Sequence, residues 1–172
     1  MILKIGYLDF LYLDGDIQKA GILIVDKNTK PIEFRATTNL EIDELQKILY
    51  GDVLEETLIK ENFALDLIKS LKIKPDLVLV KDKELLEIRS KVNVPIGYIS
   101  KFDPFKATYR YSKQISSKTG RFDTLVLMIN REDEKYLDEF IRKLQSIYKN
   151  FNLLEPFNRV FKALEYLSQE RS

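Results

Sequence analysis

Residues 76–80, Asp-Leu-Val-Leu-Val, are the feature that most constrains how this chain can fold. Four consecutive apolar residues lack the alternation of a strand with one solvated face, so they are typical of a strand covered on both faces of a parallel sheet. Residues 83–92 are then expected to form a short helix and residues 94–100, Val-Pro-Ile-Gly-Tyr-Ile-Ser, the next strand. The sequence therefore predicts a βαβ unit with a right-handed crossover.

Three antiparallel strands are predicted before this unit. Residues 2–13, 20–26 and 32–38 are apolar and β-branched, and turn-forming residues separate them at 14–16 and 27–31. From Leu40 the apolar spacing becomes helical, which predicts a helix that begins after Asn39 and ends at Gly51. Residues 57–71 repeat the helical spacing and predict a second helix that leads into the buried strand.

The C-terminal part predicts one further strand and two helices. Residues 102–120 are irregular and could be a loop or the hairpin partner of a strand at 122–129. Helices are expected at 132–150 and 157–167, where apolar residues form a stripe. Because no repeat or flexible linker interrupts the 172 residues, we expect one α/β domain spanning 1–172 with a mixed sheet.

Cysteine and histidine are both absent, which shortens the list of possible chemistries. Histidine-dependent triads, cysteine nucleophiles, zinc sites built on these ligands, haem and iron–sulfur clusters are not expected. Carboxylates, lysines, tyrosines and hydroxyls remain. No signal peptide or membrane-spanning run is found, so a cytoplasmic protein without a membrane partner is expected. Charged residues make up 32% of the chain, which would suit a heat-adapted organism.

The predicted elements follow the order of three antiparallel strands, a helix, a strand, a helix and another strand. Three stretches of sequence stand out within this order. A helix that ends in Ala-Leu-Asp-Leu-Ile-Lys-Ser-Leu-Lys at 64–72 is followed by Lys-Pro-Asp-Leu-Val-Leu-Val at 74–80. Val-Pro-Ile-Gly-Tyr-Ile-Ser-Lys follows at 94–101. With these motifs, residues 1–101 resemble endonuclease V within the ribonuclease H-like superfamily. The resemblance implies a ribonuclease H-like mixed sheet flanked by helices.

The resemblance also implies a metal site. Asp9 matches the first aspartate of the family and Glu61 could match its glutamate, so these residues and Asp82 are the candidate catalytic ligands of Mg²⁺ or Mn²⁺. The family has its next aspartate directly after the buried strand, where this chain has Lys81. A lysine there would repel a cation, and the one-residue shift to Asp82 would turn the carboxylate to the opposite face. The family's strand-separating Pro-Tyr-Ile-Pro-like wedge has no counterpart here.

Structural roles are the alternatives for these carboxylates. Asp9 would be an ordinary strand carboxylate, and Asp82 would be the N-cap of the helix that begins at Lys83.

A second candidate site is the basic and aromatic segment at 101–121. It holds six basic residues against Asp103, interleaved with four aromatic residues. Basic groups can contact phosphates and aromatic rings can stack on bases. The candidate nucleic-acid-binding residues are Lys101, Lys106, Tyr109, Arg110, Lys113, Lys118 and Arg121. The alternative is an edge strand whose charges prevent aggregation.

Two functions stay open from the sequence. One is a divergent ribonuclease H-like protein that binds nucleic acid and acts as a metal-dependent nuclease through Asp9, Glu61 and Asp82. The other is a non-catalytic module that binds a protein partner or a second copy of itself, because acidic residues dominate 41–66 and could meet the basic segment.

Overall fold

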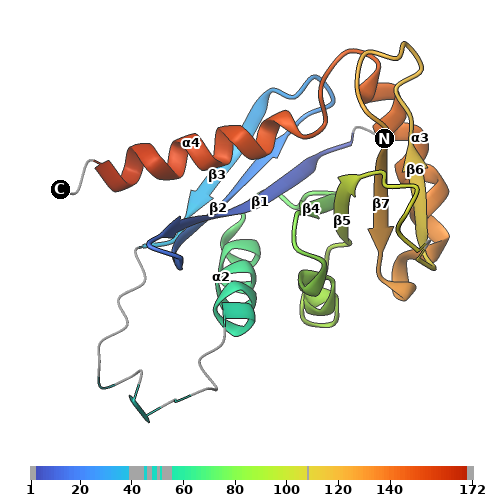
Figure 1. Cartoon of the computed structure of the whole chain (residues 1–172). Helices are drawn as coiled ribbons and strands as arrows, with labels where there is room; N and C mark the ends of the chain where they lie inside the picture. The colour runs from blue at the N-terminus through green and yellow to red at the C-terminus, as the bar shows by residue number, and fades with distance from the viewer. Residues whose placement is uncertain are drawn as a thin grey trace.

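The computed structural model describes residues 3–38, 45, 48, 49, 51, 56–107 and 109–169. Across these residues the strands form one seven-stranded sheet in the order β3-β2-β1-β4-β5-β7-β6 (Figure 1). The strands are β1 Ile5–Leu13, β2 Asp16–Val25, β3 Pro31–Ala36, β4 Leu77–Val80, β5 Ile96–Lys101, β6 Ser112–Ile115 and β7 Leu125–Ile129.

The strand pairing confirms the predicted mixed sheet. β1, β2 and β3 form an antiparallel meander, and β4 pairs in parallel with both β1 and β5. The connection from β4 to β5 contains η2, Lys83–Lys91, which is a 3-10 helix. The sequence therefore placed the βαβ unit correctly, because a fully apolar strand needs neighbours and cover on both faces.

The irregular segment after β5 leads into a hairpin strand. β6 pairs antiparallel with β7, and β7 in turn pairs antiparallel with β5. Of the two structures that the sequence left open for 102–120, the hairpin partner is therefore present from Ser112, while the residues before it form a loop. The helix predicted from Leu40 lies mostly outside the described residues.

Helices cover both faces of the sheet. Helix α4, Glu155–Gln169, runs across β1 and β2 on one face, and α2, Glu56–Ser70, packs on β2 from the other face (Figure 1). Helix α3, Leu137–Tyr148, packs near β6. The helix predicted over 132–150 is divided in two, because a 3-10 helix, η3 Arg131–Tyr136, precedes α3. No helix in the described part of the chain is long and apolar enough to cross a membrane.

Alternating side chains on the central strands separate two apolar cores. In β1, Tyr7 and Leu11 belong to the core under α3 and α4, whereas Leu8 and Phe10 belong to the core under α2 and η2. In β4, Leu79 enters the first core and its neighbours at 78 and 80 enter the second. This alternation decides which way the residues at the strand ends point.

Candidate carboxylate site and basic groove

Asp9 lies in the middle of β1 and is buried, with 8% of its surface exposed. Its neighbours Leu8 and Phe10 face the core under α2, so Asp9 faces the side of α4. The Nζ atom of Lys81 lies 3.0 Å from its Oδ2, and the backbone N–H of Phe10 donates to its Oδ1 at 2.9 Å. Burial raises the pKa of Asp9, and the charge of Lys81 offsets part of that rise.

Asp82 bonds a different lysine. It stands at the N-cap position of η2, as the structural alternative expected, but its side chain makes no capping hydrogen bond. Instead its Oδ1 lies 3.2 Å from Nζ of Lys60, which also lies 3.4 Å from Glu56 Oε1. Lys60 is only 5% exposed, and its ammonium group lies over the rings of Phe10 and Tyr12 at 5.7 and 5.5 Å.

The pKa of Lys60 follows from these neighbours. Burial by itself would lower the pKa, but hydrogen bonds to Tyr12 and Asp82 and the charge of Asp82 raise it above its usual value. Lys60 is therefore a fixed positive charge at neutral pH. Lys60 was not among the predicted site residues, although its spacing of four from Glu56 is that of a helical ion pair.

The two aspartates belong to opposite sides of the sheet. Lys81, the partner of Asp9, lies 5.5 Å from the ring centroid of Phe157 in α4. Asp82 is bonded to Lys60 of α2, which packs on the other face. The consecutive residues Lys81 and Asp82 thus face opposite sides of the sheet, as the alternation of side chains along a strand predicts.

The three candidate metal ligands do not form one group. Glu61 follows Lys60 on α2 and is partly exposed. Within the described residues, no cluster of three or more carboxylate side chains could hold a metal ion. The structure does not bring Asp9, Glu61 and Asp82 into one group: two lysines bond the aspartates, and the aspartates face opposite sides. The residues present therefore do not fit the Mg²⁺ or Mn²⁺ site that the resemblance implied.

The basic and aromatic segment borders a cavity of about 630 Å³, which we call the basic groove. Its floor is made of paired residues on one face of three strands, with Tyr98 opposite Met128 and Ser100 opposite Val126. Ser112 and Gln114 of β6 extend the same two rows. The groove is lined by Lys83, Tyr98, Ser100, Lys101, Phe102, Asp103, Lys106, Ala107, Tyr109, Ser112, Lys113, Gln114, Val126 and Met128.

Four of the seven predicted nucleic-acid-binding residues line this groove: Lys101, Lys106, Tyr109 and Lys113. The other three are not among the lining residues. Arg110 and Arg121 have their guanidinium carbons 5.2 Å from the rings of Tyr111 and Phe122, and Lys118 is exposed in the loop before β7. The floor residues and Lys83 were missed, because they come together only through the pairing of β5, β6 and β7.

The lysines of the groove differ in their availability. Lys113 forms an ion pair with Asp138 of α3. Lys101 lies 3.8 Å from Asp123, and both side chains are largely exposed, so this pair is weak in water. The ammonium of Lys83 lies 3.6 Å from the ring centroid of Tyr109. Lys106 has no ion-pair partner among the described residues.

No protein-family model matches the chain, and no curated protein sequence matches it. Solved structures of similar fold do exist. Human endonuclease V superposes with a TM-score of 0.63 at 12% identity, covering 99% of this chain and 87% of that one. Endonuclease V of Ciona intestinalis, in complex with a 23mer DNA containing an inosine followed by a ribo-adenosine, gives 0.60 at 10% identity and covers 99% and 87%. The chain has the ribonuclease H-like fold of endonuclease V.

Proposed function

We propose that this chain binds single-stranded nucleic acid in the basic groove. The observation that carries the proposal is the lining of the groove, in which four lysines and one aspartate surround a floor of aromatic, hydroxyl and amide side chains. The chain as a whole has a net charge of +1, so this local excess of positive charge is not a consequence of composition. An anionic ligand with planar bases is complementary to such a lining.

The rim of the groove supplies contacts for phosphates. Lys83, Lys101 and Lys106 come from two separate segments, one that begins η2 after β4 and one that runs from the end of β5 into the next loop. Lysine ammonium groups bind phosphate as point charges without requiring a fixed orientation. Lysines spread along a rim therefore suit successive phosphates of one strand.

The floor of the groove supplies contacts for a base. Tyr98 offers a ring, and Ser100 of β5 and Gln114 of β6 offer hydrogen-bonding groups on either side of β7. Small-ligand sites have volumes of about 300 to 1,000 Å³, and the groove falls inside this range. A base must be unstacked to enter, which favours a single strand over a duplex.

Phe105, which lies in the chain between the lining residues Asp103 and Lys106, supports the same assignment. The Oδ1 atom of Asp103 accepts the backbone N–H of Phe105 at 2.9 Å, and the backbone N–H of Lys106 donates to the carbonyl of Asp103 at 3.2 Å. This turn presents Phe105 to solvent with 95% of its surface exposed. Such a side chain contributes little to the core, whereas stacking on an unpaired base is worth about 1–3 kcal/mol.

A structural neighbour adds support. The endonuclease V of Ciona intestinalis, which has the same fold, was crystallised in complex with DNA. At 10% identity this likeness shows the fold alone, so the proposal for this chain depends on its own groove residues.

Fluorescence anisotropy with labelled single-stranded DNA and RNA of about 12 nucleotides tests the proposal. Lys101→Gln/Lys106→Gln should weaken binding about tenfold or more and should flatten the salt dependence, because two phosphate contacts are lost. Lys27→Gln/Lys30→Gln, in the turn between β2 and β3, removes the same charge elsewhere and should change affinity less than about twofold.

Competition separates nucleic acid from other polyanions. Unlabelled single strands should displace the probe at much lower concentration than duplex DNA or polyglutamate. The proposed function is wrong if the wild type binds no strand, if the two double variants weaken binding equally, or if polyglutamate competes as well as nucleic acid. The last outcome would indicate an acidic protein partner instead.

A further inference from the structure

We infer that the ammonium groups of Lys81 and Lys60 take the place of divalent cations beside Asp9, Asp82 and Glu56, which we call the carboxylate edge. The carboxylate edge would then be held together by ion pairs within the chain and would bind no metal. The inference comes from the two lysine–carboxylate pairs and their placement in the sheet, and it is independent of nucleic-acid binding. It explains how a sheet with the endonuclease V fold keeps Asp9, in the middle of β1, and Asp82, just after β4, without a metal-binding group.

The first pair occupies the carboxylate of Asp9, which faces α4. Nζ of Lys81 lies 3.0 Å from Asp9 Oδ2, while Oδ1 of the same aspartate accepts the backbone N–H of Phe10. Both oxygens of Asp9 therefore have partners. The ammonium group also lies over Phe157, which places it between the strand and α4. A divalent cation would have to displace this ammonium group and would be repelled by its charge.

The second pair closes the α2 side. Lys60 is almost fully buried, and its ammonium group lies between Asp82 and Glu56 with Phe10 and Tyr12 below it. Without the ammonium group, the two carboxylates would lose their counter-charge. Without the carboxylates, the ammonium group would be a buried, unpaired charge. A divalent cation in this position would have to displace the ammonium group and would find only these two carboxylates, which are fewer oxygen ligands than such cations take.

The charge and the geometry of these carboxylates both disfavour a divalent cation. Three carboxylates, from Asp9, Asp82 and Glu56, meet two ammonium groups, so most of the negative charge that would attract a divalent cation is already neutralised. Asp9 and Asp82 also point to opposite faces of the sheet. Hard divalent cations need several oxygen ligands on one side of one site. Among the residues that the structure describes, no group of three or more carboxylates provides them.

Calorimetric titration with Mn²⁺, followed by thermal unfolding with and without Mn²⁺, tests the inference. The wild type should show no saturable binding below about 1 mM and no shift of its unfolding temperature. Lys81→Asp places a second carboxylate beside Asp9 on the same face and should bind Mn²⁺ at least tenfold more tightly. Asp9→Asn added to Lys81→Asp should abolish that gain. Lys91→Asp, an exposed lysine at the end of η2, is the matched control and should gain nothing.

Each outcome decides the inference. Saturable Mn²⁺ binding by the wild type that Asp9→Asn removes would overturn it, because the edge would then be a metal site. A folded Lys81→Asp that binds no more Mn²⁺ than the wild type would also overturn it, since the lysine would not be what excludes the metal. If circular dichroism shows that Lys81→Asp does not fold, Lys81→Asn, which puts an uncharged amide oxygen beside Asp9, replaces it: a gain of Mn²⁺ binding supports the inference and no gain overturns it.

Discussion

The ammonium group of Lys83 lies 3.6 Å from the ring centroid of Tyr109, which joins the first residue of η2 to the loop between β5 and β6. The two residues are far apart in the sequence and both line the basic groove. A cation–π contact at an exposed site is worth about 0.5–1 kcal/mol. The contact is thus weak enough to open and strong enough to set the resting position of the loop.

Lys83→Met should therefore loosen the loop and leave the fold intact. Hydrogen exchange of the backbone amides at 102, 103, 105–107 and 109–111 should become about two- to fivefold faster, in line with the loss of about 0.5–1 kcal/mol. The free energy of global unfolding should change by less than about 0.5 kcal/mol, because the contact lies outside both apolar cores. Exchange measured by mass spectrometry gives the first quantity and urea unfolding gives the second.

Lys91→Met is the matched control, because Lys91 is an exposed lysine at the other end of η2. It should leave the exchange of the loop unchanged. Equal acceleration in both variants would mean that η2 itself is disturbed, and the contact between Lys83 and Tyr109 would then not be what holds the loop.

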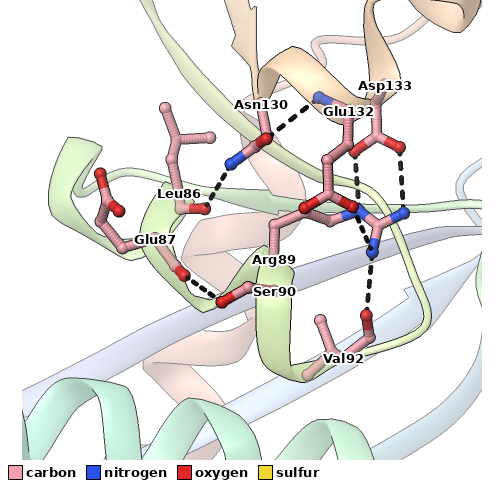
Figure 2. A network of polar contacts seen from close by, with 8 residues as sticks. All are labelled: Leu86, Glu87, Arg89, Ser90, Val92, Asn130, Glu132 and Asp133. Atoms are coloured by element: carbon pink, nitrogen blue, oxygen red, sulfur yellow. Dashed lines mark hydrogen bonds and ion pairs between the residues drawn. The ribbon is translucent and has the colours of Figure 1, made fainter.

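A buried ion pair joins η2 to η3. Asp133 is 1% exposed and accepts two hydrogen bonds from Arg89, at 2.8 Å from Nε and 3.1 Å from Nη2 (Figure 2). Arg89 also donates to the carbonyl of Val92 at 2.9 Å, and Glu132 lies 3.8 Å away. Arg89→Met should destabilise the fold by about 3–5 kcal/mol, since it leaves a buried carboxylate without its partner. Urea unfolding measures the loss.

Removing both charges should cost much less than removing one. Arg89→Met/Asp133→Leu should recover most of the stability that Arg89→Met loses, because no unpaired carboxylate remains. Glu132→Gln should cost less than about 1 kcal/mol, because this carboxylate is half exposed. If the double variant is as unstable as Arg89→Met, the unpaired carboxylate is not the cause of the destabilisation.

The strands that show a clear apolar pattern were predictable from the sequence. Apolar alternation and β-branched residues identified the meander, and the fully apolar run identified β4 as a central parallel strand. The resemblance to endonuclease V in 1–101 agreed with the fold. These features depend on residues close together in the chain, which is why a single sequence reveals them.

The geometry of the two candidate sites could not be predicted, because it depends on contacts between residues that are distant in the sequence. The burial of Lys60 follows from how α2 packs on β2, which places its ammonium group over Phe10 and Tyr12 of the neighbouring β1. The floor of the basic groove needs the register of β5, β6 and β7, which brings residues near 98, 113 and 127 together. Lys81 was recognised as unfavourable for a metal, but its bond to Asp9 required the parallel pairing of β1 and β4.

Glu33 connects β3 to the loop after α2 and should make stability depend on pH. Its carboxylate accepts the backbone N–H groups of Lys72 and Ile73 at 3.1 and 2.9 Å, and Nε of Arg35 at 2.8 Å. Desolvation would raise the pKa of Glu33, but these hydrogen bonds lower it below its usual value. The stabilisation is therefore present above the usual pKa of about 4.3 and is lost as the pH falls through the lowered value.

Glu33→Gln should thus be destabilised by about 1–2 kcal/mol near pH 7, and the difference from the wild type should shrink near pH 3. Urea unfolding across this range measures both. Glu87→Gln, at an exposed position of η2, should match the wild type throughout. A difference for Glu33→Gln that does not change with pH would show that the ionised carboxylate is not what stabilises the loop.

Close packing explains why position 97, in the Pro-Ile-Gly motif of β5, is a glycine. A Cβ atom at this position would lie 2.7 Å from Cδ1 of Leu127 on β7, and 3.2 and 3.3 Å from the side chains of Leu79 and Leu77 on β4. All three leucines are fully buried. Gly97→Ala should therefore destabilise the fold by about 1–3 kcal/mol through overpacking.

A double-mutant cycle identifies the clash. Leu127→Val removes the Cδ1 atom and should cost about 1 kcal/mol by itself, since it leaves a small cavity. Combined with Gly97→Ala, the cost should be less than the sum of the two single changes by at least about 0.5 kcal/mol, because the added methyl group fills the space that Cδ1 left. Urea unfolding of the four proteins measures this coupling. Purely additive effects would mean that the methyl group is accommodated by a shift of the strand and that close packing against Leu127 does not require glycine at this position.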